Sequence, residues 1–172
     1  MSKRFRTLLV FFSCARLIVF FSDVPVVAAA GQEYKPQFID ALSTTDLLAE
    51  TNAARKTDGE PALRMDPLLV QAAEDKAEDM RAKGYWAHFR PGDHKAPWDF
   101  ITTAGYTYKV AGENLAQGFR TSRGITSAWL NSPAHRANLL SAKYTDVGFA
   151  SIYTTQPDGS ELLLTVQMFG SR

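Results

Sequence analysis

Cysteine is almost absent from this sequence. The single cysteine among 172 residues, Cys14, lies in the middle of an apolar segment near the N-terminus, whereas a lipid-attachment cysteine would close such a segment after small residues. From residue 31 onward the chain has no thiol, which excludes a cysteine nucleophile and a disulfide framework there. A chain of this kind can enter an oxidising compartment without forming disulfides.

An excess of positive charge is also missing. Four of the 19 basic residues but only one of the 18 acidic residues fall in the first thirty positions, so the rest of the chain has a formal net charge of −2. Nucleic acids and anionic membranes are bound by concentrated basic faces. We therefore expect neither as a partner.

The sequence has no uninterrupted apolar run long enough to span a membrane. The N-terminal run "TLLVFFSCARLIVFF" is broken by Arg16 and followed by Asp23, so it falls short of the ~18 residues of a spanning helix. The positive start "MSKRFR" and the small residues of "VVAAAG" instead predict a signal peptide, cut after Ala28 or Ala30. We expect a secreted or periplasmic protein with no stable membrane span after cleavage.

These features divide the chain into a signal peptide at 1–30, a lead-in segment at 31–44 and one domain at 45–172. No internal repeat or low-complexity tract is present. The domain is long enough to bury a substantial core, and we expect it to be a monomer.

The first half of the domain shows helical spacing. The stretch "STTDLLAETNAARK" predicts a helix that a residue at 43–45 could cap. The stretch "MDPLLVQAAEDKAEDMRAKG" predicts a second helix, with Asp66 as N-cap, Pro67 at the first helical position and Gly84 beyond the last turn. Its expected buried stripe comprises Leu69, Ala73, Ala77 and Met80.

The later part of the domain changes character. We expect a short helix at 97–104 and then two helical pieces that meet at Pro133. The segments "DVGFASIYTT" and "ELLLTVQMFG" alternate with a period of two and are joined by "QPDGS", which predicts a hairpin. Helices followed by a closing hairpin indicate an α+β layered domain.

One carboxylate sits in an unusually apolar setting. Glu113 lies in "VAGENLAQGF", and a buried carboxylate is costly unless it is paired or hydrogen-bonded, so we expect a turn or waiting partners there. The candidate partners are His88 and His135, at separations of 25 and 22 residues. No two of these residues have the spacing of a helical metal site, so spacing alone does not distinguish a metal site from structural histidines.

Two other chemistries fit poorly. Ser132 lies three residues before His135, but "NSPAH" lacks the strand-to-helix elbow of a serine nucleophile and more simply places Ser132 as an N-cap. "AGENLAQG" lacks the lysine of a phosphate-binding loop. Trp129 falls on the apolar face of its predicted helix, and we expect it to be buried.

Five segments in order resemble the bacterial branch of the CAP superfamily, also called SCP-like extracellular proteins. They are "LLAETNAARKTDGEPALRMDPLLVQAAEDKAEDM", "GYWAH", "AGENLAQG", "AWLNSPAHRANLL" and "YTDVGFA". The resemblance runs from about Leu47 to Phe169. It implies a three-layer α-β-α sandwich in which helices cover both faces of a small antiparallel sheet.

The resemblance also implies a cleft that gathers His88, Glu113 and His135. In that setting the glycine before Glu113 would allow a close backbone approach, and Asn114 would hold the turn through its side-chain amide. Eukaryotic members carry a second glutamate three residues after the tryptophan, where this chain has Ser132 after Trp129. A zinc ion held by His88 and His135 would therefore have fewer anionic ligands.

The sequence is compatible with three functions. The first is a secreted, non-enzymatic protein that binds a small ligand or an extracellular partner, which the lack of an activated nucleophile favours. The second is a zinc-dependent hydrolase in which His88 and His135 hold the metal and Glu113 is a base or ligand. The third is a structural protein of the envelope or cell surface.

Overall fold

The computed structural model describes residues 42–172. The expected signal peptide and nearly all of the lead-in segment lie outside the described residues. No helix within 42–172 is long and apolar enough to cross a bilayer. In chain order the elements are α1 (Thr44–Asp58), β1 (Arg64–Met65), α2 (Pro67–Lys83), α3 (Pro97–Thr103), β2 (Val110–Gln117), α4 (Ser122–Asn131), α5 (Pro133–Leu139), β3 (Asp146–Thr155) and β4 (Glu161–Ser171).

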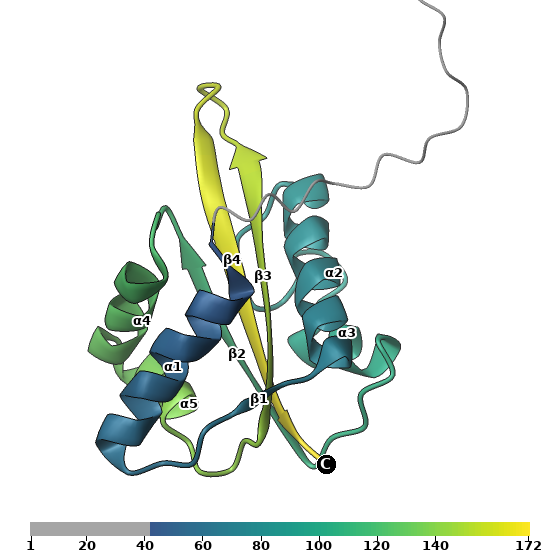
Figure 1. The fold of residues 1–172 in the computed structure, drawn as a ribbon. Helices are drawn as coiled ribbons and strands as arrows, with labels where there is room; N and C mark the ends of the chain where they lie inside the picture. The colour runs from purple at the N-terminus through teal and green to yellow at the C-terminus, as the bar shows by residue number, and fades with distance from the viewer. Residues whose placement is uncertain (1–41) are drawn as a thin grey trace, which may run out of the picture. The chain divides into compact units, whose positions relative to one another are not determined.

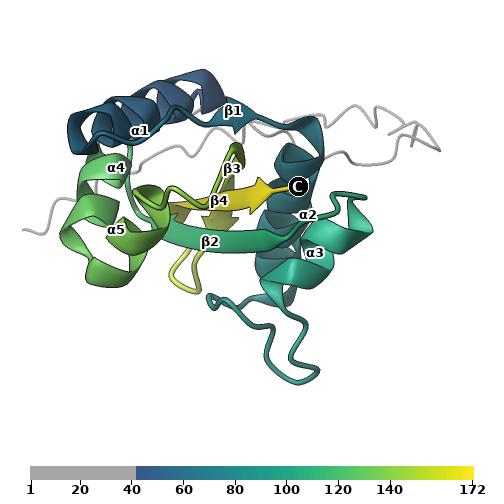
Figure 2. The ribbon, with the colours of Figure 1, turned by 90° about the horizontal axis from the view of Figure 1, so that it is seen from below.

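The described domain has three layers (Figure 1). The central sheet has the order β1-β3-β4-β2, in which β2, β3 and β4 are antiparallel and the two-residue β1 adds a parallel pair to β3. Seen from below, α2 and α3 cover one face of the sheet, and α1, α4 and α5 cover the other (Figure 2). The predicted α+β class and three-layer sandwich are confirmed.

Each face of the sheet has its own apolar core. The core under α2 contains the whole predicted stripe of that helix, with Leu69, Ala73, Ala77 and Met80 all buried. Strand β4 serves both cores because its side chains alternate between the two faces. Leu164, Val166 and Met168 face α2, whereas Leu163 and Phe169 belong to the core under α1 and α4.

Helix α2 begins and ends where its sequence predicts. The Asp66 side chain accepts a hydrogen bond from the backbone N–H of Leu68 at 2.9 Å, and Gly84 follows the last turn with φ of 64°. Asp66 and Gly84 therefore fix the length of the helix that packs along β3 and β4.

The segment around Glu113 is a strand and not the turn that we predicted. Residues 110–117 form β2, and Glu113 lies opposite Met168 of β4. A Cβ atom at Gly112 would lie closer than 3.0 Å to the Tyr144 side chain, whose ring stacks on Phe169 at 5.0 Å. Gly112 thus leaves room for the Tyr144 side chain in its present position, and it does so within a strand and not in a turn.

Strand β2 forms one edge of the sheet, and side chains cover its outward carbonyl groups. The carbonyls of alternate residues accept hydrogen bonds from three different segments of the chain. They are Ala111 (from Tyr144 Oη, 3.3 Å), Glu113 (from Asn138 Nδ2, 3.0 Å) and Leu115 (from Trp129 Nε1, 3.1 Å).

Candidate functional site

Glu113 is a buried carboxylate on the edge strand β2. Only 3% of the residue is exposed, and its Oε1 lies 2.5 Å from Nδ1 of His88. His88 reaches Glu113 from the loop between α2 and α3, and 49% of its side chain is exposed. The structure therefore brings together two of the three residues that the sequence singled out, and presents the imidazole to solvent.

Lys76 on α2 supplies the nearby positive charge. The residue is fully buried, and its Nζ donates hydrogen bonds to three groups of the loop that carries His88. The acceptors are the His88 carbonyl (2.7 Å), the Ala87 carbonyl (2.9 Å) and the Tyr85 hydroxyl (3.2 Å). One buried ammonium group therefore fixes the backbone of this loop while its charge acts on Glu113.

Lys76 was not among the residues predicted for the site, although the sequence contains a signal for it. Lys76 follows Ala73 by three positions and precedes Met80 by four, so it falls on the predicted buried stripe of α2. A lysine on an apolar stripe needs partners for its ammonium group. Helical spacing could therefore have identified it as part of a buried polar cluster.

The electrostatics of the pair follow from burial and contact. Burial raises the pKa of the Glu113 carboxyl, and the hydrogen bond with His88 and the Lys76 charge oppose that rise. The hydrogen bond with Glu113 raises the pKa of His88 against the effect of burial. The second carboxylate oxygen of Glu113, Oε2, is buried and has no protein hydrogen-bond partner among the described residues.

His135 lies on α5, on the other side of β2 from Lys76. No hydrogen bond joins its ring to Glu113 or His88 in residues 42–172, so the predicted contact with Glu113 is made by His88 alone. Burial lowers the pKa of His135, and the positive charge of His88 lowers it further. His135 is thus close enough to be affected by His88 without bonding to it.

Asn114 positions the backbone of His135. Its Nδ2 donates to the His135 carbonyl at 3.2 Å and to Gln167 Oε1 at 3.0 Å, and its Oδ1 accepts from Asn138 at 3.0 Å. We predicted that this amide holds a turn. Instead it joins β2 to α5 and to β4.

Ser132 and Trp129, the other supporting residues, have structural positions. Ser132 precedes α5 at the N-cap position, but its side chain makes no capping hydrogen bond. Trp129 is buried, as predicted, with 1% of the residue exposed. Its indole N–H donates to the Leu115 carbonyl, which supports β2 two residues beyond Glu113.

The donor set does not fit the zinc centre that the sequence left open. Among residues 42–172, no group of three or more histidine, cysteine, aspartate or glutamate side chains could hold a metal ion. His88 and His135 therefore have no third ligand of these types beside them in residues 42–172 with which to hold a metal ion.

The two histidines should titrate on opposite sides of the ordinary histidine pKa of about 6.5. NMR titration of the imidazole Cε1–H signals should place His88 above this value and His135 below it. Because the folded pKa of His88 is raised, its contribution to stability is complete below pH ~6.5 and is lost as the pH rises through the folded value.

The contribution of His135 to stability has the opposite pH dependence, because its folded pKa is lowered. It is complete above pH ~6.5 and is lost as the pH falls through the folded value. Glu113→Gln should move the His88 midpoint down, because it removes the negative charge that His88 and Lys76 face. A His88 midpoint that is unchanged in Glu113→Gln would contradict the assigned contact.

Known proteins with similar sequences place this chain in one family. The model described as "CAP: Cysteine-rich secretory protein family" matches residues 48–169. The Bacillus subtilis (strain 168) protein YkwD is 38% identical over 111 residues, which cover 62% of this chain and 43% of YkwD. The membrane protein YlbC of the same organism is 30% identical over 123 residues, covering 70% of this chain and 34% of YlbC. The chain therefore matches less than half the length of these relatives.

Solved structures share the fold. An extracellular protein containing an SCP domain from Bacillus anthracis (strain Ames) superposes with a TM-score of 0.61 at 27% identity, over 75% of this chain and 40% of that one. An outer surface protein from Borrelia burgdorferi superposes with a TM-score of 0.62 at 24% identity, over 73% and 90% of the two chains. The likeness to the Borrelia protein concerns the fold alone.

Proposed function

This chain belongs to the cysteine-rich secretory protein (CAP) family, and from that premise we propose that it is an extracytoplasmic ligand-binding protein with His88 at its contact site. The N-terminal sequence predicts export, and the Bacillus anthracis protein that shares the fold at 27% identity is described as extracellular. In this proposal His88 contacts the ligand, and Glu113 orients the His88 ring and favours its protonated form.

The observation that carries this proposal is the contact between a half-exposed imidazole and a buried carboxylate. Glu113 bonds Nδ1 of His88, which fixes the orientation of the ring and favours its protonated form. In that form both ring nitrogens carry a proton, so Nε2 can donate to a ligand. Lys76 holds the backbone of the same loop. The arrangement preorganises one donor, which lowers the entropy lost on binding.

The same contacts favour binding over covalent catalysis. Within residues 42–172, no serine, threonine or cysteine side chain is hydrogen-bonded to His88 or Glu113. A nucleophile activated by a histidine would lie within hydrogen-bond reach of it. The ligand would carry an acceptor, such as a carbonyl, carboxylate or hydroxyl oxygen, because Nε2 of the protonated His88 is a donor.

Native mass spectrometry of the protein isolated from its producing cells tests the proposal. We expect wild type to carry a bound small molecule, and we expect His88→Ala and Glu113→Gln to lose most of it. His94→Asn is the matched control, because His94 is exposed and asparagine tolerates its φ of 57°. A ligand retained equally by all variants would refute the site, and no bound molecule in any of them would favour the structural role.

A further inference from the structure

A second concave site lies beyond the last turn of α2. It is a pocket of about 360 Å³ between the end of that helix, the start of the following loop, the end of β2 and the hairpin that joins β3 to β4. This volume lies at the small end of the range for small-molecule sites. His88, Glu113 and His135 do not line it.

Five of the residues that line this pocket are apolar or aromatic. Tyr85 and Trp86 come from the loop, Met80 from α2, and Pro157 and Leu164 from the hairpin. Trp86 is 39% exposed, and it is one of three large hydrophobic residues exposed in the described domain. An indole at the mouth of a pocket offers a flat surface for stacking and an N–H for hydrogen bonding.

Four other lining residues are polar and neutral. They are Gln117 at the end of β2 and Thr154, Thr155 and Gln156 at the end of β3. None of these four side chains is hydrogen-bonded to another described residue. Together the amides and hydroxyls can both donate and accept.

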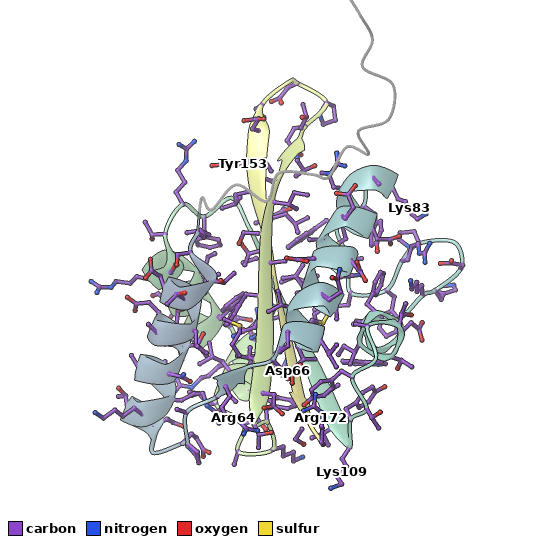
Figure 3. All side chains as sticks on the ribbon, turned by 45° about the vertical axis from the view of Figure 1, so that its right-hand side comes forward. Arg64, Asp66, Lys83, Lys109, Tyr153 and Arg172 are labelled. Atoms are coloured by element: carbon purple, nitrogen blue, oxygen red, sulfur yellow. The ribbon has the colours of Figure 1, made fainter. Side chains whose placement is uncertain are left out.

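Among the residues that the structure describes, no charged side chain lines the pocket. Arg64, Asp66, Lys109 and Arg172 lie at the opposite end of the domain from Tyr153 and the hairpin (Figure 3). Lys83, near the pocket's helix end, has its ammonium group 3.8 Å from Asp79. An ionic ligand would therefore lose hydration in the pocket without gaining a counter-charge.

We propose that this pocket binds one or two rings of a neutral carbohydrate. A pyranose ring has an apolar C–H face that suits Trp86 and Tyr85, and its rim of hydroxyls suits the amide and hydroxyl side chains in the same lining. A wholly apolar ligand would leave those amides and hydroxyls facing hydrocarbon, at a cost in binding. The proposal does not rest on the His88 site, so either can fail without the other.

NMR of the uniformly ¹⁵N-labelled protein tests this site directly. The probes are maltotriose, cellotriose and the β-1,4-linked trisaccharide of N-acetylglucosamine, each at millimolar concentration, with 1-hexanol as an apolar probe. We expect at least one trisaccharide to shift the indole N–H of Trp86 and the side-chain amide of Gln117. The indole N–H of Trp129 is an internal reference, because it is buried and hydrogen-bonded to Leu115.

Three variants distinguish stacking on Trp86 from nonspecific binding to exposed aromatic residues. Trp86→Ala should raise the Kd for the bound trisaccharide at least about tenfold, and Gln117→Leu should raise it severalfold. Phe89→Ala should leave it unchanged, because Phe89 is exposed on the same loop but does not line the pocket. Circular dichroism of each variant confirms that it is folded.

Three results would overturn the proposal. The first is the absence of Trp86 shifts with all three trisaccharides. The second is an equal response to 1-hexanol, which would assign the pocket to apolar ligands. The third is the same affinity in Trp86→Ala and Phe89→Ala.

Discussion

Trp129→Ala should lower the free energy of unfolding by about 3–5 kcal/mol. Trp129 is 1% exposed and lies in the core between α4 and the sheet, so truncation leaves a cavity that its neighbours fill only in part. It also removes the donor to the Leu115 carbonyl, at a further cost of about 1 kcal/mol. Urea unfolding followed by circular dichroism measures the loss.

Trp129→Phe is the matched control for this prediction. Phenylalanine keeps an aromatic ring in the core but cannot donate to Leu115, so the variant should lose less stability than Trp129→Ala. A loss below ~1 kcal/mol for Trp129→Ala would mean that the residue is not part of a filled interior.

Gly148→Ala should cost about 3 kcal/mol or more, at or above the upper end of ordinary overpacking. Gly148 lies on β3 where α2 crosses it, and a Cβ atom there would come closer than 3.0 Å to the backbone of Leu69 and Val70. Backbone atoms cannot turn away as a flexible side chain can, so the helix itself would have to move off the sheet.

Gly159→Ala is the matched control, because it replaces a glycine at a site where the added Cβ atom meets no described neighbour. Gly159 has a φ of 82° in the hairpin turn, and a Cβ atom there would meet no described neighbour within 4 Å. Its cost should be about 1–2 kcal/mol, from backbone conformation alone. Chemical denaturation of both variants tests the difference, and equal losses would show that α2 does not press on Gly148.

The helices were predictable because their signals are local. Asp66, Pro67 and Gly84 mark the ends of α2 within the sequence itself, and the spacing of its apolar residues marks the buried face. The hairpin of β3 and β4 was predictable for the same reason, since its strands alternate around a turn that contains Gly159.

Strand β2 was not predictable from local pattern. Its sequence "VAGENLAQ" contains a glycine, a glutamate and an asparagine, which are uncommon in strands. It is a strand because β4 pairs with it and helices cover both faces of the sheet, so its polar side chains lie among tertiary partners. Glu113 bonds His88, and Asn114 bonds Gln167 and the His135 carbonyl.

Part of the candidate site followed from the need of a buried carboxylate for a partner. That need required a partner for Glu113, and the family resemblance supplied His88 and His135, but separations of 25 and 22 residues could not distinguish between them. The structure gives the hydrogen bond to His88 and adds the charge of Lys76. Which histidine bonds Glu113 depends on how the helices and loops pack around β2, and no local sequence pattern encodes that packing.

The side chains that cover the edge of β2 bear on how these molecules behave when crowded. A bare edge strand offers its peptide groups to the strand of another chain and so invites aggregation. Here Tyr144, Asn138 and Trp129 already occupy the outward carbonyls of Ala111, Glu113 and Leu115. A second copy would have to displace an ordered tyrosine, amide and indole before it could add a strand, so this edge resists intermolecular β-pairing even at high local concentration.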